Sequence, residues 1–310
     1  MIIREELAKL RSDPAPQHQA QAALEHCLQQ WREAEGRELL RELAEYGAGR
    51  SLGECPALTV CLADGEHIAS LVRSLIECLA RHPFGHVPMR HQLSDGVGLI
   101  EIAQAGRSAL GLVLHERDCV SREPSSAAFA DLERHELLLA GRGRAVVLER
   151  LDGAAPHRTE LPLEKGSRLS LAGTRRTKVV REVREPIVTL RLTRTPERPE
   201  TTEEVCCDTG RVLHRAASNR EESCDEMAIA LLTAMERCDA IPQIAEKARR
   251  GSSSLRWQAL RHSLALDTGI GLGLLSDFAR TSDDPLAEPA RRLLQQLGER
   301  EPGGAQCLAN

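Results

Sequence analysis

The sequence predicts an α+β protein in which a central antiparallel β-sandwich or barrel is flanked by helical segments at both ends. Between residues 97 and 194, short apolar or alternating runs are separated by turns rich in Gly, Pro, Asp or Arg, which is typical of antiparallel sandwiches and barrels. Outside this stretch, apolar residues recur at helical spacing. The chain of 310 residues has room for one large domain or two to three modest ones. We expect a helical layer at 1–92, a β-sandwich at 93–216 and a helical cap at 217–310.

The N-terminal part is predicted to be helical. The expected helices span residues 1–11, 17–33, 37–46 and 64–82. Asp13 and Pro14 mark the start of the second helix, because Asp caps helices and Pro suits their first position. In the fourth helix an apolar stripe from Ile68 to Leu79 indicates a buried face. The apolar run Pro56–Leu62 is short, and we expect a strand or a packed connector there.

The β-rich stretch is predicted from its alternation and its turns. The expected strands span residues 97–103, 108–116, 135–140, 145–150, 167–171, 177–181 and 187–192. The best-marked turn is Ala140–Arg144, where two glycines allow the positive φ of a tight hairpin. Leu151–Pro156 predicts a second turn, and Ser121–Asp131 a longer connection. A further hairpin is expected around Asp208–Gly210.

The C-terminal part returns to helical spacing. The expected helices span residues 223–235, 242–249, 254–266, 270–280 and 284–297. Ser223–Glu226 fits a capping box at the start of the first of them. Its core face is expected to contain Met227, Ile229 or Ala230, Leu231, Ala234 and Met235. Asp267 or Thr268 is the expected cap of the fourth helix, and Asp284 is the expected cap of the last one.

Two segments of the central stretch resemble the cupin family. Leu163–Thr174 is similar to the later part of a cupin barrel, and His135–Val147 is similar to a cupin hairpin that turns at two glycines. The resemblance implies a jelly-roll fold and a homodimer. The first cupin metal motif has two histidines one residue apart followed by Glu, whereas this chain offers only His115-Glu116 and His135-Glu136. The resemblance therefore implies a metal site that is degraded or rebuilt.

The C-terminal helices resemble HEAT-type repeats. The similarity rests on Leu255–Leu260 in one predicted helix and Asp284–Leu294 at the start of another. It covers at most one and a half repeats. Units of this kind stack and offer a surface to partners, but a small helical cap on the barrel fits the same residues.

Composition limits the classes of binding partner and the cellular compartment that we expect for this protein. The net charge of -5 and an aromatic content of 2% argue against nucleic acid, since base stacking needs exposed rings. No signal-peptide pattern and no run of about 20 apolar residues occurs, so no membrane span is expected. The ten cysteines show no C-x-x-C spacing and are expected as thiols in a reducing cytoplasm.

One segment is strongly basic. Residues 165–198 contain ten basic and three acidic residues, and Arg175, Arg176 and Lys178 are the candidate anion- or ligand-binding residues. The other interpretation is that arginines on outward-facing strand positions keep the sheet solvated and discourage edge pairing.

The sequence leaves two functions open, and it does not decide whether the protein is an enzyme. No Walker loop, G-x-S-x-G or H-E-x-x-H motif is present. The first hypothesis is a binding, interaction or regulatory protein with a small-molecule or protein ligand and no cofactor. The alternative is a metal-dependent cupin enzyme of the non-haem iron oxygenase or isomerase type. Its ligands would be His115, His135 and Glu136, or Glu116 in place of Glu136, and the metal a divalent transition metal, iron before others.

Overall fold

The computed structural model describes residues 13–117, 124–197, 199–217 and 220–299. By the contacts of its backbone the chain divides into two compact units. The first contains residues 1–198 and 205–211, and the second contains 199–204 and 212–310. The helix expected at 1–11 lies outside the described residues. The domain boundaries expected after residues 92 and 216 stay a prediction.

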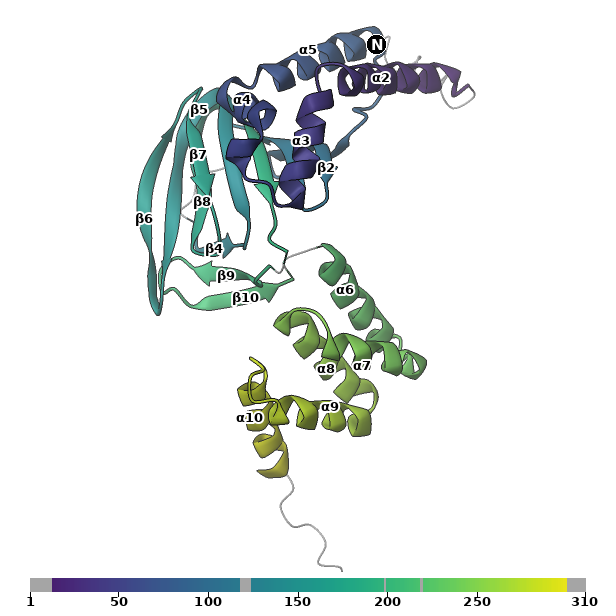
Figure 1. The fold of residues 1–310 in the computed structure, drawn as a ribbon, viewed down its shortest axis with the longest axis vertical. Coiled ribbons are helices and arrows are strands. Elements are labelled where there is room, and N and C mark those ends of the chain that lie inside the picture. Colours follow the sequence, from purple (N-terminus) through teal and green to yellow (C-terminus); the bar gives the residue numbers. More distant parts are fainter. Residues whose placement is uncertain (1–12, 118–123, 198, 218–219, 300–310) are drawn as a thin grey trace, which may run out of the picture. The chain divides into compact units, whose positions relative to one another are not determined.

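Helices form the N-terminal part of the first unit. They are α2 (Ala15–Glu33), α3 (Arg37–Ala48), the short 3-10 helix η1 (Leu52–Glu54), α4 (Pro56–Asp64) and α5 (Glu66–Arg81). Figure 1 shows them beside the upper part of the sheet. Ala15 N–H donates to the Asp13 carboxylate at 2.9 Å, and Glu66 N–H donates to that of Asp64 at 3.0 Å. Both aspartates therefore satisfy a backbone donor at a helix start, as the sequence predicts.

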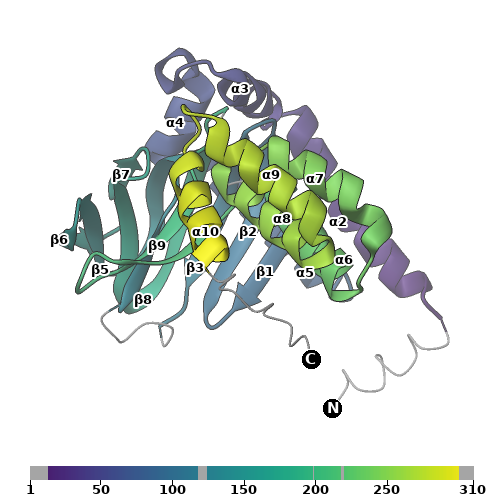
Figure 2. The same cartoon turned by 90° about the horizontal axis from the view of Figure 1, so that it is seen from below.

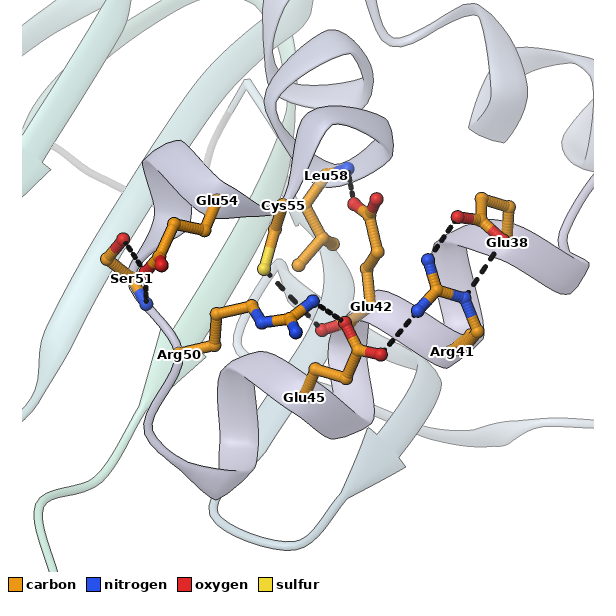
Figure 3. A network of polar contacts seen from close by, with 9 residues as sticks. All are labelled: Glu38, Arg41, Glu42, Glu45, Arg50, Ser51, Glu54, Cys55 and Leu58. Atoms are coloured by element: carbon orange, nitrogen blue, oxygen red, sulfur yellow. Dashed lines mark hydrogen bonds and ion pairs between the residues drawn. The ribbon is translucent and has the colours of Figure 1, made fainter.

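The run Pro56–Leu62 is part of helix α4, so the expected strand or connector is wrong. A short apolar run fits a buried helix as well as a strand, and its period does not separate the two. Pro56 occupies the first helical turn, where its missing N–H costs nothing. The carboxylate of Glu42, a residue only 1% exposed, accepts from Leu58 N–H at 3.0 Å. Figure 3 shows this carboxylate reaching from α3 to the start of α4, where it replaces a conventional cap.

The strands form two sheets. Their bounds are β1 (Arg90–Ser94), β2 (Val97–Ala105), β3 (Ser108–His115), β4 (Ser126–Phe129), β5 (Glu133–Leu151), β6 (Ala154–Leu163), β7 (Arg168–Leu171), β8 (Arg176–Arg194), β9 (Thr202–Cys206) and β10 (Val212–Ala216). Seven strands pair in the order β1-β2-β3-β8-β5-β6, with β7 beside β5. All pairs in this sheet are antiparallel. The strands β10, β9 and β4 form the second sheet in that order. Antiparallel sheets with flanking helices make the protein α+β, as predicted.

Strands β5 and β8 are each 19 residues long, so the expected hairpin at Ala140–Arg144 is wrong. Here β5 continues against β8 through several register shifts. Gly141 has φ +92°, and a Cβ there would lie 2.0 Å from Pro186 O. A Cβ on Gly143 would lie 2.1 Å from Glu182 O. The two glycines therefore permit a close approach of two bent strands, and the chain does not reverse.

The other predicted turns are confirmed. The turn within Leu151–Pro156 joins β5 to β6, and Gly153 has φ +72° there. The turn at Asp208–Gly210 joins β9 to β10. Three strands are not predicted from the sequence: β1, which precedes the first expected strand, β6, which follows the first of these turns, and β4, which lies inside the expected connection Ser121–Asp131.

The seven-stranded sheet has two different faces. On the helix-covered face, apolar residues of the sheet pack against α2–α5 in one core. From the sheet these are Ile102, Leu110, Leu112, Leu137, Leu190 and Leu192. On the opposite face, which we call the inner face, a smaller apolar cluster forms around the bend of β5 and β8. It consists of Leu138, Ala145, Leu163, Val180, Val183 and Ile187. Because side chains alternate along a strand, neighbouring residues of β5 or β8 belong to different faces.

The second unit contains the helices of the C-terminal part of the chain. They are α6 (Arg220–Ala234), the 3-10 helix η2 (Cys238–Ala240), α7 (Ile241–Arg249), α8 (Ser253–Leu266), α9 (Thr268–Arg280) and α10 (Ala287–Glu299). Helix α8 packs against α6, α7 and α9, and α9 against α10 (Figures 1 and 2). The Asp267 side chain caps α9 as predicted by accepting from Ile270 N–H at 2.9 Å. The HEAT-type resemblance stays a prediction.

Helix α6 departs from the prediction in two ways. It begins at Arg220, so Ser223–Glu226 lies inside the helix and does not form a capping box. The expected core residues Met227, Leu231 and Met235 are exposed by 66%, 61% and 55%. Ile229, which is also one of the expected core residues, is buried. The helical period was read correctly, but the apolar stripe of α6 is wider than the face that packs.

No helix within the described parts of the chain combines the length and the apolar character that a membrane crossing requires.

Candidate functional site

Six polar residues gather on the inner face of the seven-stranded sheet. This inner cluster consists of His115 from β3, Arg134 and Glu136 from β5, and Lys178, Thr189 and Arg191 from β8. The strand register explains the grouping. Glu136 and Gly111 both lie opposite Arg191, and residues directly opposite each other share a face. Lys178 lies in the first half of β8, which pairs with the second half of β5. It reaches Glu136 because β8 bends between Lys178 and Arg191.

Glu136 is the centre of the inner cluster. Its Oε1 accepts a hydrogen bond from Arg191 Nε at 2.8 Å, and its Oε2 is paired with Lys178 Nζ. The side chains of Glu136 and Lys178 are only 3% and 4% exposed, while that of Arg191 is 26% exposed. Burial alone would raise the pKa of Glu136, but Lys178 and Arg191 outweigh it and hold that pKa below its usual range. The carboxylate is therefore ionised.

The remaining members keep the cluster positive. Burial lowers the pKa of Lys178, but its ion pair with Glu136 acts in the opposite direction and favours the protonated amine. Burial also lowers the pKa of Arg134, and Arg191 adds to that effect, but a guanidinium stays protonated in proteins. Burial, with Lys178 and Arg191 nearby, lowers the pKa of His115 to about 4. At neutral pH the imidazole is therefore uncharged.

The charges of the inner cluster do not balance. Within the cluster, Arg134, Lys178 and Arg191 carry three positive charges and Glu136 carries one negative charge, which leaves these residues with an excess of two. Glu101 of β2, opposite Gly111, is the next carboxylate on this face and is not counted in this sum. Within the described ranges, six buried side-chain polar atoms have no hydrogen-bond partner, and three of them belong to this cluster: Arg134 Nε, Thr189 Oγ1 and His115 Nδ1. Buried polar groups are normally paired, and an unpaired buried charge is costly. The arrangement suits a small anion, which would neutralise the excess charge and accept from the free donors.

Space at the inner end of the cluster is small. A cavity of about 10 Å³ lies among residues that include Glu136, Lys178 and Thr189, which is room for about one water molecule. A larger ligand would therefore have to contact the cluster from the side of Arg191, its more exposed cation. On that side the residue opposite Arg191 in β3 is Gly111, so no side chain from this position covers the guanidinium.

The three predicted metal ligands are not brought together. His115 and Glu136 belong to the inner face, but His135 precedes Glu136 in the strand and lies on the helix-covered face. There its Nδ1 lies 2.9 Å from Ser170 Oγ and its Nε2 lies 3.0 Å from Glu133 Oε1. Its ring packs edge-on to Tyr46 of α3, with centroids 6.5 Å apart. Over the ranges that the structure covers, no group of three or more His, Cys, Asp or Glu residues could hold a metal.

Of the predicted anion-binding residues, only Lys178 joins the inner cluster. The Arg175 side chain is 70% exposed and lies 3.5 Å from the Asp152 carboxylate. Arg176 is exposed at the start of β8. Much of the basic segment is neutralised locally. Three further ion pairs of this segment lie outside the inner cluster: Arg181–Glu160, Arg184–Glu182 and Arg194–Glu133.

Arg134, Thr189 and Arg191 are not predicted from the sequence as site residues. One signal was present: Arg134 and Glu136 alternate with apolar residues at the start of a strand, which places both charges on the same face. The pairing of β5 with β8 was needed to show that Arg191 lies opposite Glu136.

Comparisons with known proteins give only partial likenesses. No family model matches the chain, and no curated protein matches its sequence. Similar solved structures include the capsular polysaccharide assembling protein CapF from Staphylococcus aureus, at 12% identity and a TM-score of 0.28 over 35% of this chain and 31% of that one. A cupin superfamily protein from Desulfitobacterium hafniense matches at 14% identity and 0.25, over 34% of this chain and 83% of that one. The CENP-C cupin domain of Drosophila melanogaster matches at 12% and 0.27, over 34% and 74%. The matches cover about a third of this chain and less than a third of CapF, so they assign it neither a family nor an activity.

Proposed function

We propose that the protein is a non-catalytic binding protein that holds a small anion at the inner cluster, with a regulatory or interaction role. The observation that carries this proposal is the combination of two uncompensated positive charges with three unpaired buried polar atoms at one place in the sheet. An anion would supply both missing elements, the negative charge and the acceptor atoms.

The metal-dependent enzyme is the weaker alternative. It needs His115 and His135 on one metal, and the two side chains belong to opposite faces of the sheet. Lys178 and Arg191 beside His115 would also repel a divalent cation. Dimer formation and a cytoplasmic location remain expectations of the sequence.

Thermal unfolding at constant ionic strength tests the proposal. The protein is exchanged into a buffer of low anion content and titrated with chloride, acetate, malonate and inorganic phosphate. We expect at least one of them to raise Tm along a saturating curve, because a ligand that binds only the folded state stabilises it by RT ln(1 + [L]/Kd).

Two double variants are compared. The inner pair combines Arg134→Gln with Arg191→Gln, and the control pair combines Arg175→Gln with Arg184→Gln. The control pair is exposed and paired only with surface carboxylates. The inner pair should lose the saturating response and the control pair should keep it. If no anion saturates, or if the inner pair responds like the parent protein, the proposal is wrong.

A further inference from the structure

We infer that the anion is a dianion with two ionised oxygens that accept from separate cationic donors of the inner cluster, as in a short dicarboxylate or a phosphate. This inference rests on the proposed function and adds the class of ligand to it.

The first reason is charge. Glu136 compensates one of the three cations through Arg191 Nε and Lys178 Nζ. A monoanion would leave one positive charge unpaired at a place where the side chains of Glu136 and Lys178 are almost completely buried. A dianion would bring the cluster to neutrality, and attraction between charges is strongest where water is excluded.

The second reason is the set of donors that remain. Arg191 uses only its Nε on Glu136 among the described residues, so both terminal nitrogens of its guanidinium are left for a ligand. Arg134 Nε lacks a partner, and so does Thr189 Oγ1 in a residue that is 2% exposed. Arg134 and Arg191 come from two neighbouring strands, and the charge of Arg191 acts on Arg134. Guanidinium groups bind carboxylate and phosphate oxygens in pairs. Two guanidiniums therefore suit two ionised oxygens better than one.

The third reason is the shape of the cluster. The inner end beside Lys178 and Thr189 admits about one water, so a long chain does not fit there. The ligand must carry its charges close together and within reach of Arg191, where Gly111 leaves the opposite position without a side chain. Compact dianions meet this condition, whereas anions with one charge on a bulky apolar body do not.

Isothermal titration calorimetry at pH 8 separates the classes, with malonate, inorganic phosphate and acetate as probes at matched ionic strength. We expect at least one dianion to bind tenfold or more tightly than acetate. Malonate ahead of phosphate would indicate a dicarboxylate, and the reverse order a phosphate. Equal binding of acetate and both dianions would overturn the inference and leave the proposed function standing. Absence of binding by all three would overturn both.

Two variants check that the preference comes from the charge of the cluster. Arg134→Gln lowers the excess from two to one, and the preference for a dianion over acetate should fall by about tenfold. Lys178→Met leaves Glu136 paired with Arg191 and also lowers the excess to one, so the preference should fall by a similar factor. Far-ultraviolet circular dichroism confirms that each variant is folded. An unchanged preference in the folded Arg134→Gln variant, or in the folded Lys178→Met variant, contradicts the inference.

Discussion

Strands β5 and β8 carry a group of charged residues on each of their two faces, and the two groups are built differently. On the helix-covered face, Arg194 donates to Glu133, to Arg50 O at 2.7 Å and to Tyr46 O at 3.1 Å. Its guanidinium also lies over the Tyr46 ring, 4.1 Å from the centroid. On the inner face, Glu136 is the one carboxylate of a cluster with three cations, and Arg134 Nε, Thr189 Oγ1 and His115 Nδ1 have no partner among the described residues, whereas on the helix-covered face the Tyr46 hydroxyl has none. The two groups therefore differ in charge balance: Glu133 pairs with Arg194 on one face, while Glu136 stands beside three cations on the other, and this difference makes the inner cluster the candidate for anion binding.

The largest effect is expected from breaking the buried pair of the inner face. Glu136→Leu leaves Lys178 buried without its counter-ion, and we expect the free energy of unfolding to fall by about 3–5 kcal/mol. The double variant Glu136→Leu with Lys178→Met removes both charges and should recover most of that loss. Urea unfolding monitored by circular dichroism measures both. A single variant within about 1 kcal/mol of the parent would show that the pair is not buried in solution.

Removal of the central cation on the helix-covered face should cost less. Arg194→Met deletes the bonds to Glu133 and to two carbonyls that end α3 and its loop, and we expect a loss of about 2 kcal/mol. Arg184→Met, an exposed arginine of the same strand, should stay within about 0.5 kcal/mol. Anion binding at the inner cluster should be unchanged in Arg194→Met if the variant is folded. A large loss of binding there would mean that the two faces are coupled.

The next effect is a pH dependence carried by His115. Its pKa is lowered from 6.5 to about 4 in the folded protein, so the unfolded chain binds more protons between these values. The neutral imidazole therefore contributes stability that is present above pH 6.5 and is lost as the pH falls towards 4. We expect the parent protein to lose about 2 kcal/mol more than His115→Gln over this window. His157→Gln, at an exposed histidine of β6, is the control. Parallel stability curves for the parent and His115→Gln would refute the assignment.

The smallest effect is expected in metal content. Because His115 and His135 belong to opposite faces, protein purified without chelator should contain far less than one equivalent of transition metal by elemental mass spectrometry. His115→Gln and His135→Gln should leave that value unchanged. About one equivalent in the parent, lost in both folded variants, would instead favour the metal-dependent enzyme.

The sequence predicted most elements because their signals are local. The stripe Ile68–Leu79, the cap Asp267 and the turn at Gly153 each depend on a few neighbouring residues. The failures need information from distant parts of the chain. Gly141 and Gly143 read as a hairpin turn, and only the approach of Pro186 and Glu182 shows that they serve a strand crossing.

The residues of the candidate site also divide into those with a local sequence signal and those that only the fold identifies. A locally basic sequence pointed to Lys178 as an anion ligand. Arg191 comes from the same basic segment, but nothing local distinguishes it from its neighbours Arg184 and Arg194, which form ion pairs elsewhere. The pairing register decides which arginine lies opposite Glu136. A single sequence contains no direct signal for that register.

The uninterrupted pairing of β5 with β8 also affects how the sheet can open. These two strands run through both halves of the sheet and stay paired from Glu133 to Glu149 across the bend. Because the parts of the sheet on both sides of the bend contain β5 and β8, neither part can open without disturbing strands of the other. Amide hydrogen exchange should therefore show the protected amides of both halves exchanging together, with one common opening free energy. The edge strand β1, whose five residues are all exposed, should exchange earlier as a separate unit.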